Sequence, residues 1–342
     1  MSGANITLAV LQKNGISQNE YWSKRILEMI KLENTNFVFT QLGTNVTIPL
    51  QEGTKTFTAR RYNHIPYDAT GKHLLTEGVA PTALKPEAHK VSGVVNQYGV
   101  VMEETDVAAD VHFDNVKTIY QPELARHAAE VRERNIIASF TDASEYYVGV
   151  GNTTLNSIEA TDVVTFKDFR TVALTMTNYN RVGHRKYAGK FVGVLHPNVM
   201  NDLLDDPVLI NKLLVPGQDN TPIKQGTLAK YMVYGMYFTD TLVCPVVKNT
   251  ATTPVNVYTS YVLGQDPYMV IGLGDGNVKF FDTGFTADKA DPLAQKATFG
   301  YKMWTGAKVT DPMAITKIYS ASGYDVVADF SKDTYGAAAS QE

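Results

Sequence analysis

The sequence predicts an α+β protein in which one long helix and several long strands accompany a separate α/β segment. The helix is expected over about residues 115–140, where apolar residues recur along one side at helical spacing. Runs typical of long strands lie at residues 297–309 and 313–320. In the segment after Gly149, helical and strand patterns alternate. Such alternation is typical of α/β units, whereas the long strands and helix outside it favour the α+β class.

The composition limits the classes of function. The chain has 342 residues, of which 44% are hydrophobic, enough for a sizeable core. Its formal net charge is −4, so it lacks the overall basic field that marks a sequence-specific nucleic-acid binder. A mildly acidic charge remains compatible with a protein that merely encloses nucleic acid.

The single cysteine, Cys244, lies in an apolar run of residues 242–245. A lone cysteine excludes an intrachain disulfide and a cysteine-based zinc cluster, and we expect it to be a buried apolar residue rather than a nucleophile. The first residues lack the basic segment of a secretory signal, and no run approaches the roughly eighteen apolar residues of a membrane span. We therefore expect a protein of the reducing cytosol, unless it leaves by another route.

The first 46 residues are expected to form an N-terminal arm. A helix is predicted over residues 18–33, where Ser17 can cap the helix and Glu20 can complete the capping pair. Tyr21, Ile26 and Met29 supply part of its apolar stripe.

The segment from about residue 43 to 91 is unusual because it contains no face able to build a core. Residues 55–62 predict a strand, with Lys55 and Phe57 on one face and Arg60 and Tyr62 on the other. A long loop rich in proline and glycine follows. Since long structureless loops are uncommon in compact domains, we expect this segment to pack on another subunit, with a disordered insert as the alternative. The predicted intersubunit contacts are Lys55, Phe57, Arg60, Arg61, Tyr62, Tyr21 and Trp22.

The remaining elements follow from local signals. A strand is expected over residues 91–104, and Pro122 is expected near an early turn of the long helix. The apolar stripe of that helix is predicted to consist of Leu124, Ala128, Val131, Asn135 and Ala138.

In the α/β segment, Thr165 and Asp168 form a capping pair for a helix. A central strand over residues 190–195 ends at His196, before a further helix. Residues 310–312 predict a tight hairpin between the two closing strands. The last residues, 331–342, are polar and are expected to be loose.

No catalytic, cofactor-binding or metal-binding residue can be assigned. The glycines at 272–276 run into another strand instead of a helix, which favours a loop over a nucleotide site. His196 could be catalytic in an α/β fold, but a turn into a helix is favoured. The carboxylates of Asp202, Asp205 and Asp206 could touch a divalent ion, although solvated side chains are the simpler interpretation. The cations listed next could bind phosphate or, as we prefer, carboxylates of a partner: Lys55, Arg60, Arg61 and Lys72.

Several segments, in this order, resemble the major capsid proteins of tailed bacteriophages with the Hong Kong 97-type fold, and more finely the family typified by coliphage N-four. They are KTFTARRYNHIP at 55–66, LTEGVAPT at 75–82, NQYG at 96–99, VLHPN at 194–198, DLL at 202–204, ADPLAQKATFGYK at 290–302, GAKV at 306–309 and AITKIYSAS at 314–322. They are spread from about residue 37 to 322. None is a chemical motif by itself, but their joint order is specific.

The resemblance implies a major capsid (head) protein that is not an enzyme. It would assemble itself through hexamers and pentamers into an icosahedral shell around double-stranded DNA in the virion, after synthesis in the bacterial host cytoplasm. The implied segments are an N-terminal arm (1–46), an extended loop (47–90), a peripheral domain with a spine helix (91–150), an axial domain (151–285) and a return to the peripheral domain with closing strands and tail (286–342).

The sequence departs from the Hong Kong prototype because about 45 residues precede the extended loop, which is too few for a scaffolding segment. A separate scaffolding protein, or none, is therefore expected, with portal and decoration proteins as further partners. No cofactor and no membrane contact is expected. Two alternatives stay open: an encapsulin-like compartment shell protein and an α/β enzyme that uses His196.

Overall fold

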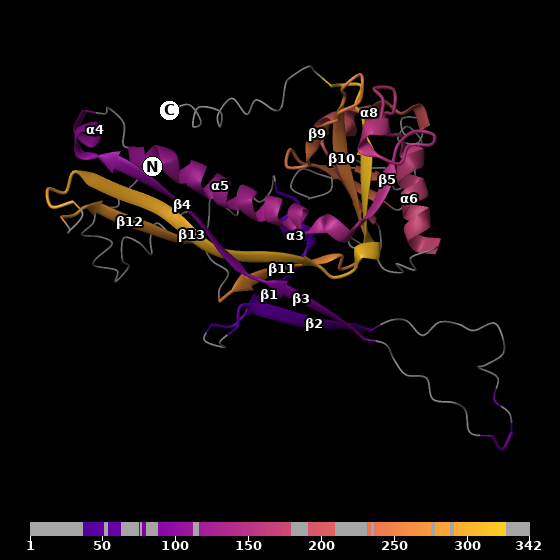
Figure 1. Ribbon diagram of the computed structural model, residues 1–342, viewed down its shortest axis with the longest axis horizontal. Helices are drawn as coiled ribbons and strands as arrows, with labels where there is room; N and C mark the ends of the chain where they lie inside the picture. Colours follow the sequence, from indigo (N-terminus) through magenta and orange to yellow (C-terminus); the bar gives the residue numbers. More distant parts are fainter. Residues whose placement is uncertain are drawn as a thin grey trace, which may run out of the picture.

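The protein consists of two β-sheets, a long helix and a projecting hairpin (Figure 1). The computed structural model describes residues 37–50, 54–62, 75, 77–79, 88–111, 116–178, 191–208, 231–233, 236–274, 278–287 and 291–325. The predicted helix at 18–33, the predicted contacts Tyr21 and Trp22, the cation Lys72 and the tail from 331 lie outside these residues.

The first sheet is built around β13 (Lys296–Val309), which is 14 residues long. On one side β13 pairs with β4 (Asn96–Thr105), and on the other with β12 (Lys279–Phe285) and β11 (Tyr268–Leu273), all antiparallel. A parallel strand, β1 (Thr44–Ile48), extends the sheet beyond β11. We call these strands the long sheet.

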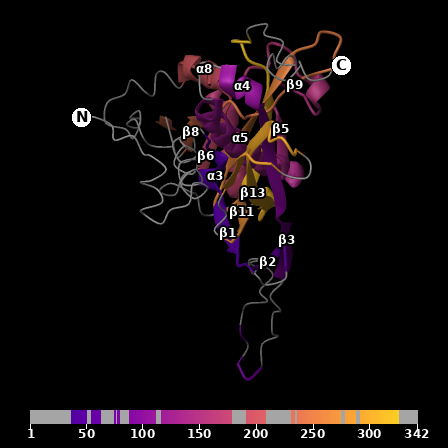
Figure 2. The ribbon, with the colours of Figure 1, turned by 90° about the vertical axis from the view of Figure 1, so that its left-hand side faces the viewer.

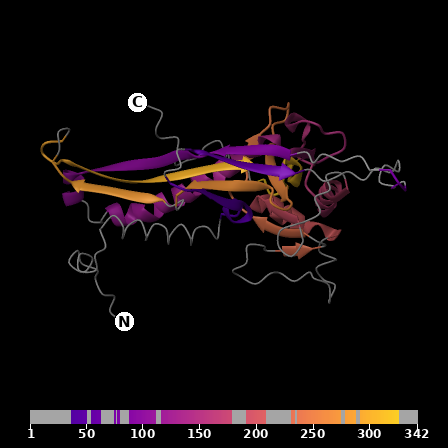
Figure 3. The same ribbon diagram turned by 90° about the horizontal axis from the view of Figure 1, so that it is seen from below.

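The helix α5 (Val116–Ala138) runs along one face of the long sheet (Figures 1 and 3). Small side chains let it lie close to the strands, because Ala125, Ala128 and Ala129 are buried against the aromatic rings of Phe299 and Tyr301. The predicted helix is confirmed, with Pro122 inside it. The predicted stripe is partly wrong: Leu124 and Ala128 are buried, Val131 and Asn135 are half-buried, and Ala138 is exposed.

The second sheet follows the order β5 (Ser144–Tyr147), β14 (Ile315–Ser320), β10 (Asn256–Leu263), β6 (Phe191–Leu195), β8 (Met236–Asp240) and β7 (Tyr231–Val233), with β9 (Val246–Lys248) also paired to β10. The helices α6 (Phe166–Asn178) and α8 (Pro197–Asp205) accompany it. Their apolar sides share one core with the strands, in which Phe169 and Phe238 meet edge to face at 5.2 Å between ring centroids.

The local predictions in this part are confirmed. Thr165 donates its backbone N–H and its hydroxyl to the Asp168 carboxylate, at 2.9 and 2.6 Å, at the start of α6. The five residues of β6 are buried, and α8 begins after His196 as its N-cap, with Pro197 in the first turn.

The predicted hairpin at residues 310–312 is wrong. β13 and β14 belong to different sheets, and the short 3₁₀ helix η3 (Pro312–Ala314) leads the chain from one to the other. Asp311 turns the backbone because its side chain accepts a hydrogen bond from the N–H of Met313 at 3.1 Å. The turn signal was real, but it marks a crossing between sheets.

One aromatic cluster fills the space where the two sheets meet. It lies beside α3 (Phe39–Leu42) and η1 (Phe140–Asp142), two short helices that the sequence did not predict. Phe39 contacts Phe140 and Tyr261 edge to face, at 5.9 and 5.3 Å between centroids. Such pairs each add about 0.5–1.5 kcal/mol beyond apolar burial, so this cluster is a main connection between the sheets.

The hairpin consists of β2 (Thr56–Tyr62) and β3 (Ala88–Val94), paired antiparallel. Figure 2 shows it extending below the long sheet. A single strand was predicted over 91–104, but it is interrupted at the buried Val95, whose N–H donates to the carbonyl of Lys55 at 3.0 Å. The first half therefore pairs in the hairpin, and the second half, as β4, pairs with β13.

The sheets divide the chain differently from the predicted segments. β11 and β12 fall within 151–285, predicted as the axial domain, yet they belong to the long sheet. β14 falls within 286–342, yet it belongs to the second sheet. The reason is that long-range pairing, which local patterns do not encode, decides sheet membership. Within the described ranges, no helix is both long and apolar enough to cross a membrane.

Candidate subunit interface

The hairpin has two different faces. Burial alternates along β2, so Phe57, Ala59 and Arg61 are half-buried while their neighbours are exposed. Phe57 and Ala59 pack with the partly buried Val91 onto a small core under the long sheet that includes Ile271. The alternation was predicted, but this face contributes to a core of its own chain, contrary to expectation.

Two charged residues fix the hairpin to the long sheet on this same inner face. The Arg61 guanidinium lies 2.6 Å from the Asp311 carboxylate, and the Lys55 ammonium lies 5.4 Å from the centre of the Trp304 ring. Each contact is worth up to about 1 kcal/mol at partly exposed positions. They orient the hairpin more than they stabilise the fold.

Close backbone approach also seats the hairpin. A Cβ on Gly93 would lie 2.2 Å from Cδ1 of Ile271, and a Cβ on Gly306 would lie 2.3 Å from the carbonyl oxygen of Val94. Side chains at these two positions would push the base of the hairpin away from β11 and β13. The glycines therefore determine how closely the hairpin approaches the sheet.

The outer face of the hairpin is exposed and carries a like-charge pair. Arg60 lies directly opposite Lys90, and the next pair on the same face, two residues further along, is Tyr62 with Ala88. Tyr62 is 62% exposed. Like charges directly opposite each other destabilise a strand pair by up to about 1 kcal/mol. This arrangement is unfavourable for the isolated chain.

The predicted contact residues therefore separate into two groups. Lys55, Phe57 and Arg61 contact their own chain, whereas Arg60 and Tyr62 face outward from the hairpin. Their contact with another subunit stays a prediction.

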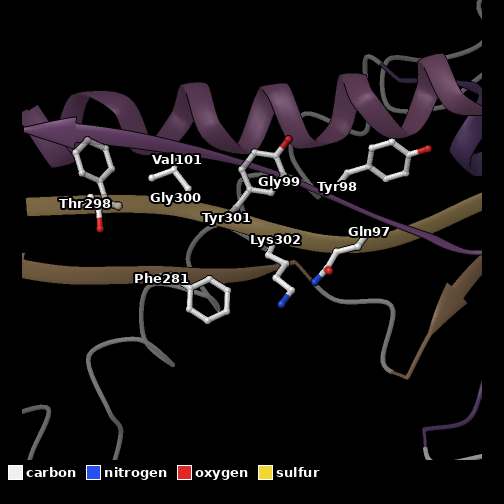
Figure 4. Close-up of a pocket in the computed structure, with 10 residues that line it drawn as sticks. Gln97, Tyr98, Gly99, Val101, Phe281, Thr298, Gly300, Tyr301 and Lys302 are labelled. Atoms are coloured by element: carbon white, nitrogen blue, oxygen red, sulfur yellow. The ribbon is translucent and has the colours of Figure 1, made fainter. Parts of the chain in front are cut away.

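The hairpin covers one part of the face of the long sheet opposite α5, at Ile271. The rest of this face is uncovered among the described residues and contains a groove of about 320 Å³ (Figure 4). Tyr301 points toward α5, whereas Phe281 and Lys302 point to the opposite side. Gly99 and Gly300 form part of the groove wall because they present backbone without side chains. The exposed Phe281 makes the groove partly apolar.

One end of the long sheet is acidic. Glu103 lies near the end of β4, and the helix α4 (Asp106–Val111) that follows carries Asp106 and Asp110 one turn apart. Glu103 lies 3.3 Å from the Lys296 ammonium, and both side chains are about 60% exposed (60% and 59%). We call Glu103, Asp106 and Asp110 the acidic end.

A fully buried carboxylate attaches α3 to α5. Glu133 accepts hydrogen bonds from the N–H of Phe39 at 2.9 Å, the N–H of Thr40 at 2.6 Å and the Thr40 hydroxyl at 2.5 Å. Burial raises the pKa of Glu133, an effect opposed by these hydrogen bonds and by Arg132. The sequence analysis missed this residue. Its signal was an acidic residue four positions after Ala129 and three before Ile136, in line with the buried side of the helix.

His196 lies at the carboxyl end of β6, but its surroundings are structural. Its Nδ1 accepts from the N–H of Asn198 at 3.3 Å, and its ring lies 5.0 Å from that of Tyr258. Burial lowers the pKa of His196. Tyr258 in turn donates to Asp325 at 2.8 Å. The preferred interpretation of His196, a turn into a helix, is confirmed by its N-cap role.

The three carboxylates of α8 bind separate backbone or side-chain groups. Asp202 accepts from the N–H of Gly323 at 3.0 Å, Asp205 bonds to the hydroxyl of Tyr324, and Asp206 accepts from the N–H of Phe166 at 2.8 Å. Asp205 is exposed, as the solvated interpretation predicted, whereas Asp202 is buried and Asp206 half-buried, so their hydrogen bonds hold parts of the fold together. No group of metal-binding side chains occurs within the described part of the chain.

Cys244 is buried and reduced, as predicted. Burial raises the pKa of its thiol. Since the thiolate is the reactive form, this residue lacks the properties of a nucleophile.

Solved phage shells contain chains that are similar to this one. The capsid of Ralstonia phage GP4 matches with a TM-score of 0.65 at 11% identity, over 86% of this chain and 92% of that chain. The capsid asymmetric unit of cyanophage Pam1 matches with a TM-score of 0.62 at 10% identity, over 80% and 87%. The capsid of cyanophage P-SCSP1u matches with a TM-score of 0.59 at 16% identity, over 84% and 88%. No protein-family model and no curated protein sequence matches the chain.

Identities this low show a common fold. The matches extend over most of both chains, so the likeness concerns the architecture as a whole and not one short motif. The chain therefore has the Hong Kong 97-type phage capsid fold, an α+β architecture, as the sequence resemblance implied.

Proposed function

We propose that this protein is the major capsid protein of a tailed bacteriophage, which assembles with copies of itself into an icosahedral shell around double-stranded DNA. The observation that carries the proposal is the match of most of the chain to several phage capsid chains. The finer resemblance to the coliphage N-four type belongs to the same proposal and has its support in the ordered sequence segments.

The architecture suggests a role for each part. The long sheet with α5 would be the peripheral domain, the second sheet with α6 and α8 the axial domain, and β2–β3 the base of the extended loop. The predicted bounds 91–150, 151–285 and 286–342 would then be interrupted, because strands of each sheet come from distant parts of the chain. Of the predicted arm, 1–46, the residues from Phe39 on form α3 and the start of β1 and so belong to the core and the long sheet; the arm would be confined to the residues before them.

Surfaces that suit self-association support the proposal. The outer hairpin face and the uncovered side of the long sheet expose Tyr62, Val101 and Phe281, which are 62%, 70% and 47% exposed. Contacts between different patches on successive copies close into rings, such as hexamers and pentamers. Several modest contacts made together give a stable shell.

The test is electron microscopy of the purified chain, alone and with a truncated hairpin. Tyr62 and Ala88 are directly opposite in the hairpin, so an Asn-Gly turn could replace residues 63–87 and keep the register of the strands. The intact chain is expected to form closed shells, and the truncated chain to fold with an unchanged circular dichroism spectrum but without shells of normal size.

The contents of the shells test the remaining alternatives. Particles that package DNA support the capsid role, whereas particles that package a protein cargo would indicate an encapsulin-like compartment. Normal shells from the truncated chain would contradict the intersubunit role of the loop. Failure of the intact chain to assemble, alone or with phage scaffolding and portal proteins, would contradict the capsid proposal.

A further inference from the structure

We propose that the outer face of the hairpin, through Arg60 and Lys90, docks onto the acidic end of a second copy of this chain. This inference rests on the proposed function, because it requires that copies assemble. It names both sides of a contact for which the sequence suggested only one.

The first observation is the unbalanced charge on the hairpin. Arg60 and Lys90 are both exposed and lie directly opposite each other. In the part of the chain that the structure describes, neither takes part in an ion pair, whereas Arg61 on the inner face is paired with Asp311. The inner cation thus has its carboxylate within the chain. Among the described residues the outer pair has no such carboxylate, and a carboxylate from another copy would relieve the repulsion between its two like charges.

The second observation is the acidic end, which has the complementary charge. Asp106 and Asp110 lie four residues apart on α4 and so project from the same side of the helix. Glu103 precedes them on β4 and is exposed, although its carboxylate is already shared with Lys296 at 3.3 Å. The exposed Val107 lies between the two aspartates in the sequence and offers an apolar contact for Tyr62. Both surfaces therefore combine charges with one apolar group.

The third observation is the placement of the two surfaces. Figure 1 shows α4 at one end of the long sheet, while the hairpin lies under the opposite end. The hairpin cannot fold back to its own acidic end, because its base is fixed to β11 and β13 by Phe57, Gly93 and the Arg61–Asp311 pair. A contact between the two patches would therefore join two copies. Since the two patches differ, it is head-to-tail and can be repeated around a ring.

A nucleic acid is the competing partner for a pair of cations. Strong phosphate binding needs an extended basic surface, and here the cations are two on a chain with a net charge of −4. A carboxylate cluster on the same chain is the better complement. Long-range attraction between the two patches would also speed encounter at low salt.

Disulfide trapping tests the contact directly. The chain has one native cysteine, Cys244, which is 3% exposed, so introduced thiols give a low background. A Lys90→Cys variant mixed with an Asp110→Cys variant under mild oxidation is expected to form a disulfide-linked dimer. The matched control pairs Asp110→Cys with Lys167→Cys, an exposed lysine on α6, and is expected to give at least tenfold less dimer. Equal dimer yields in both mixtures would overturn the proposal.

Charge reversal tests its role in assembly. Lys90→Glu places opposite charges across the hairpin, which favours its folding, yet it is expected to lower the yield of shells at least tenfold. Adding Asp110→Lys is expected to restore the yield to within twofold. A normal yield of shells from Lys90→Glu would refute this docking and leave the capsid proposal intact. If those normal shells also retained less DNA, the result would assign Arg60 and Lys90 to phosphate binding. Absence of shells from the unaltered chain would instead count against the capsid proposal.

Discussion

Replacing Glu133 by alanine is expected to loosen the attachment of α3 to α5. The carboxylate is the common acceptor for the N–H groups of Phe39 and Thr40 and for the Thr40 hydroxyl, and it is completely buried. Alanine removes the acceptor and leaves these donors without a partner in the core. Phe39, which anchors the aromatic cluster between the two sheets, sits on the segment that would be released.

The size of the effect follows from the number of donors. A buried donor that loses its partner costs about 1–3 kcal/mol, so the two backbone N–H groups alone amount to about 2–6 kcal/mol. Removing a buried charge offsets part of this loss. We expect the Glu133→Ala variant to lose about 3 kcal/mol of unfolding free energy, a large fraction of the roughly 5–15 kcal/mol of a typical domain.

The assay is urea denaturation of the unassembled subunit, together with hydrogen exchange at the amides of Phe39 and Thr40. The matched control is Glu130→Ala, one turn earlier on α5, where the carboxylate pairs with Arg134 at the surface. That pair is worth at most about 0.5 kcal/mol. A loss below about 1 kcal/mol for Glu133→Ala, with unchanged exchange at both amides, would refute the reasoning.

The pH dependence gives an independent check on the same residue. Burial raises the pKa of Glu133 above its ordinary value of 4.5, so the folded chain binds this proton more tightly than the unfolded chain. The resulting stability is present below about pH 4.5 and is lost as the pH rises through the folded-state pKa. The unfolding free energy of the wild type relative to Glu133→Gln should therefore fall from pH 4.5 to pH 8. A difference that rises over this interval would contradict the assignment.

Three further predictions concern other parts of the fold. Gly300→Ala should destabilise the long sheet by about 1–3 kcal/mol, because its Cβ would lie 2.2 Å from the carbonyl oxygen of Val100; an unchanged urea midpoint would contradict this close approach. Cys244 should react with a thiol reagent at the rate of unfolding, since burial raises the pKa of its thiol; rapid labelling in native buffer would show otherwise. Asp311→Asn should cost at most about 1 kcal/mol of stability but increase hydrogen exchange in β2, because the neutral amide weakens its attraction to Arg61; unchanged exchange would argue against a role in seating the hairpin.

Local features of the fold could be predicted from the sequence. The Thr165–Asp168 cap, the turn at His196 and the alternation along β2 each depend on residues within a few positions of one another. The hydrogen bonds and backbone preferences that stabilise these features involve groups close together in the chain. The neighbouring sequence is therefore sufficient to recognise them.

Features that depend on distant contacts could not be predicted. Asp311 and Pro312 signal a turn, but whether the strands on either side pair depends on β10 and β4, far away in the sequence. Glu133 appears as another charge on a half-polar helix, because its partners lie 93 and 94 residues earlier. The candidate interface was only half predicted for the same reason: the hairpin charges are visible in one short run, whereas the opposing acidic end is recognised once α4 is placed in space.

The path of β13 has a consequence for how a shell built from this chain would bear load. Ten residues of β4 are in register with β13, so a pull along the strands strains all these hydrogen bonds in shear at once. A pull across the strands would instead open them one after another. We therefore expect the long sheet to be mechanically stiff along its length and weaker across it. Because β13 continues through η3 into β14, tension along this direction would pass by covalent backbone from one sheet into the other.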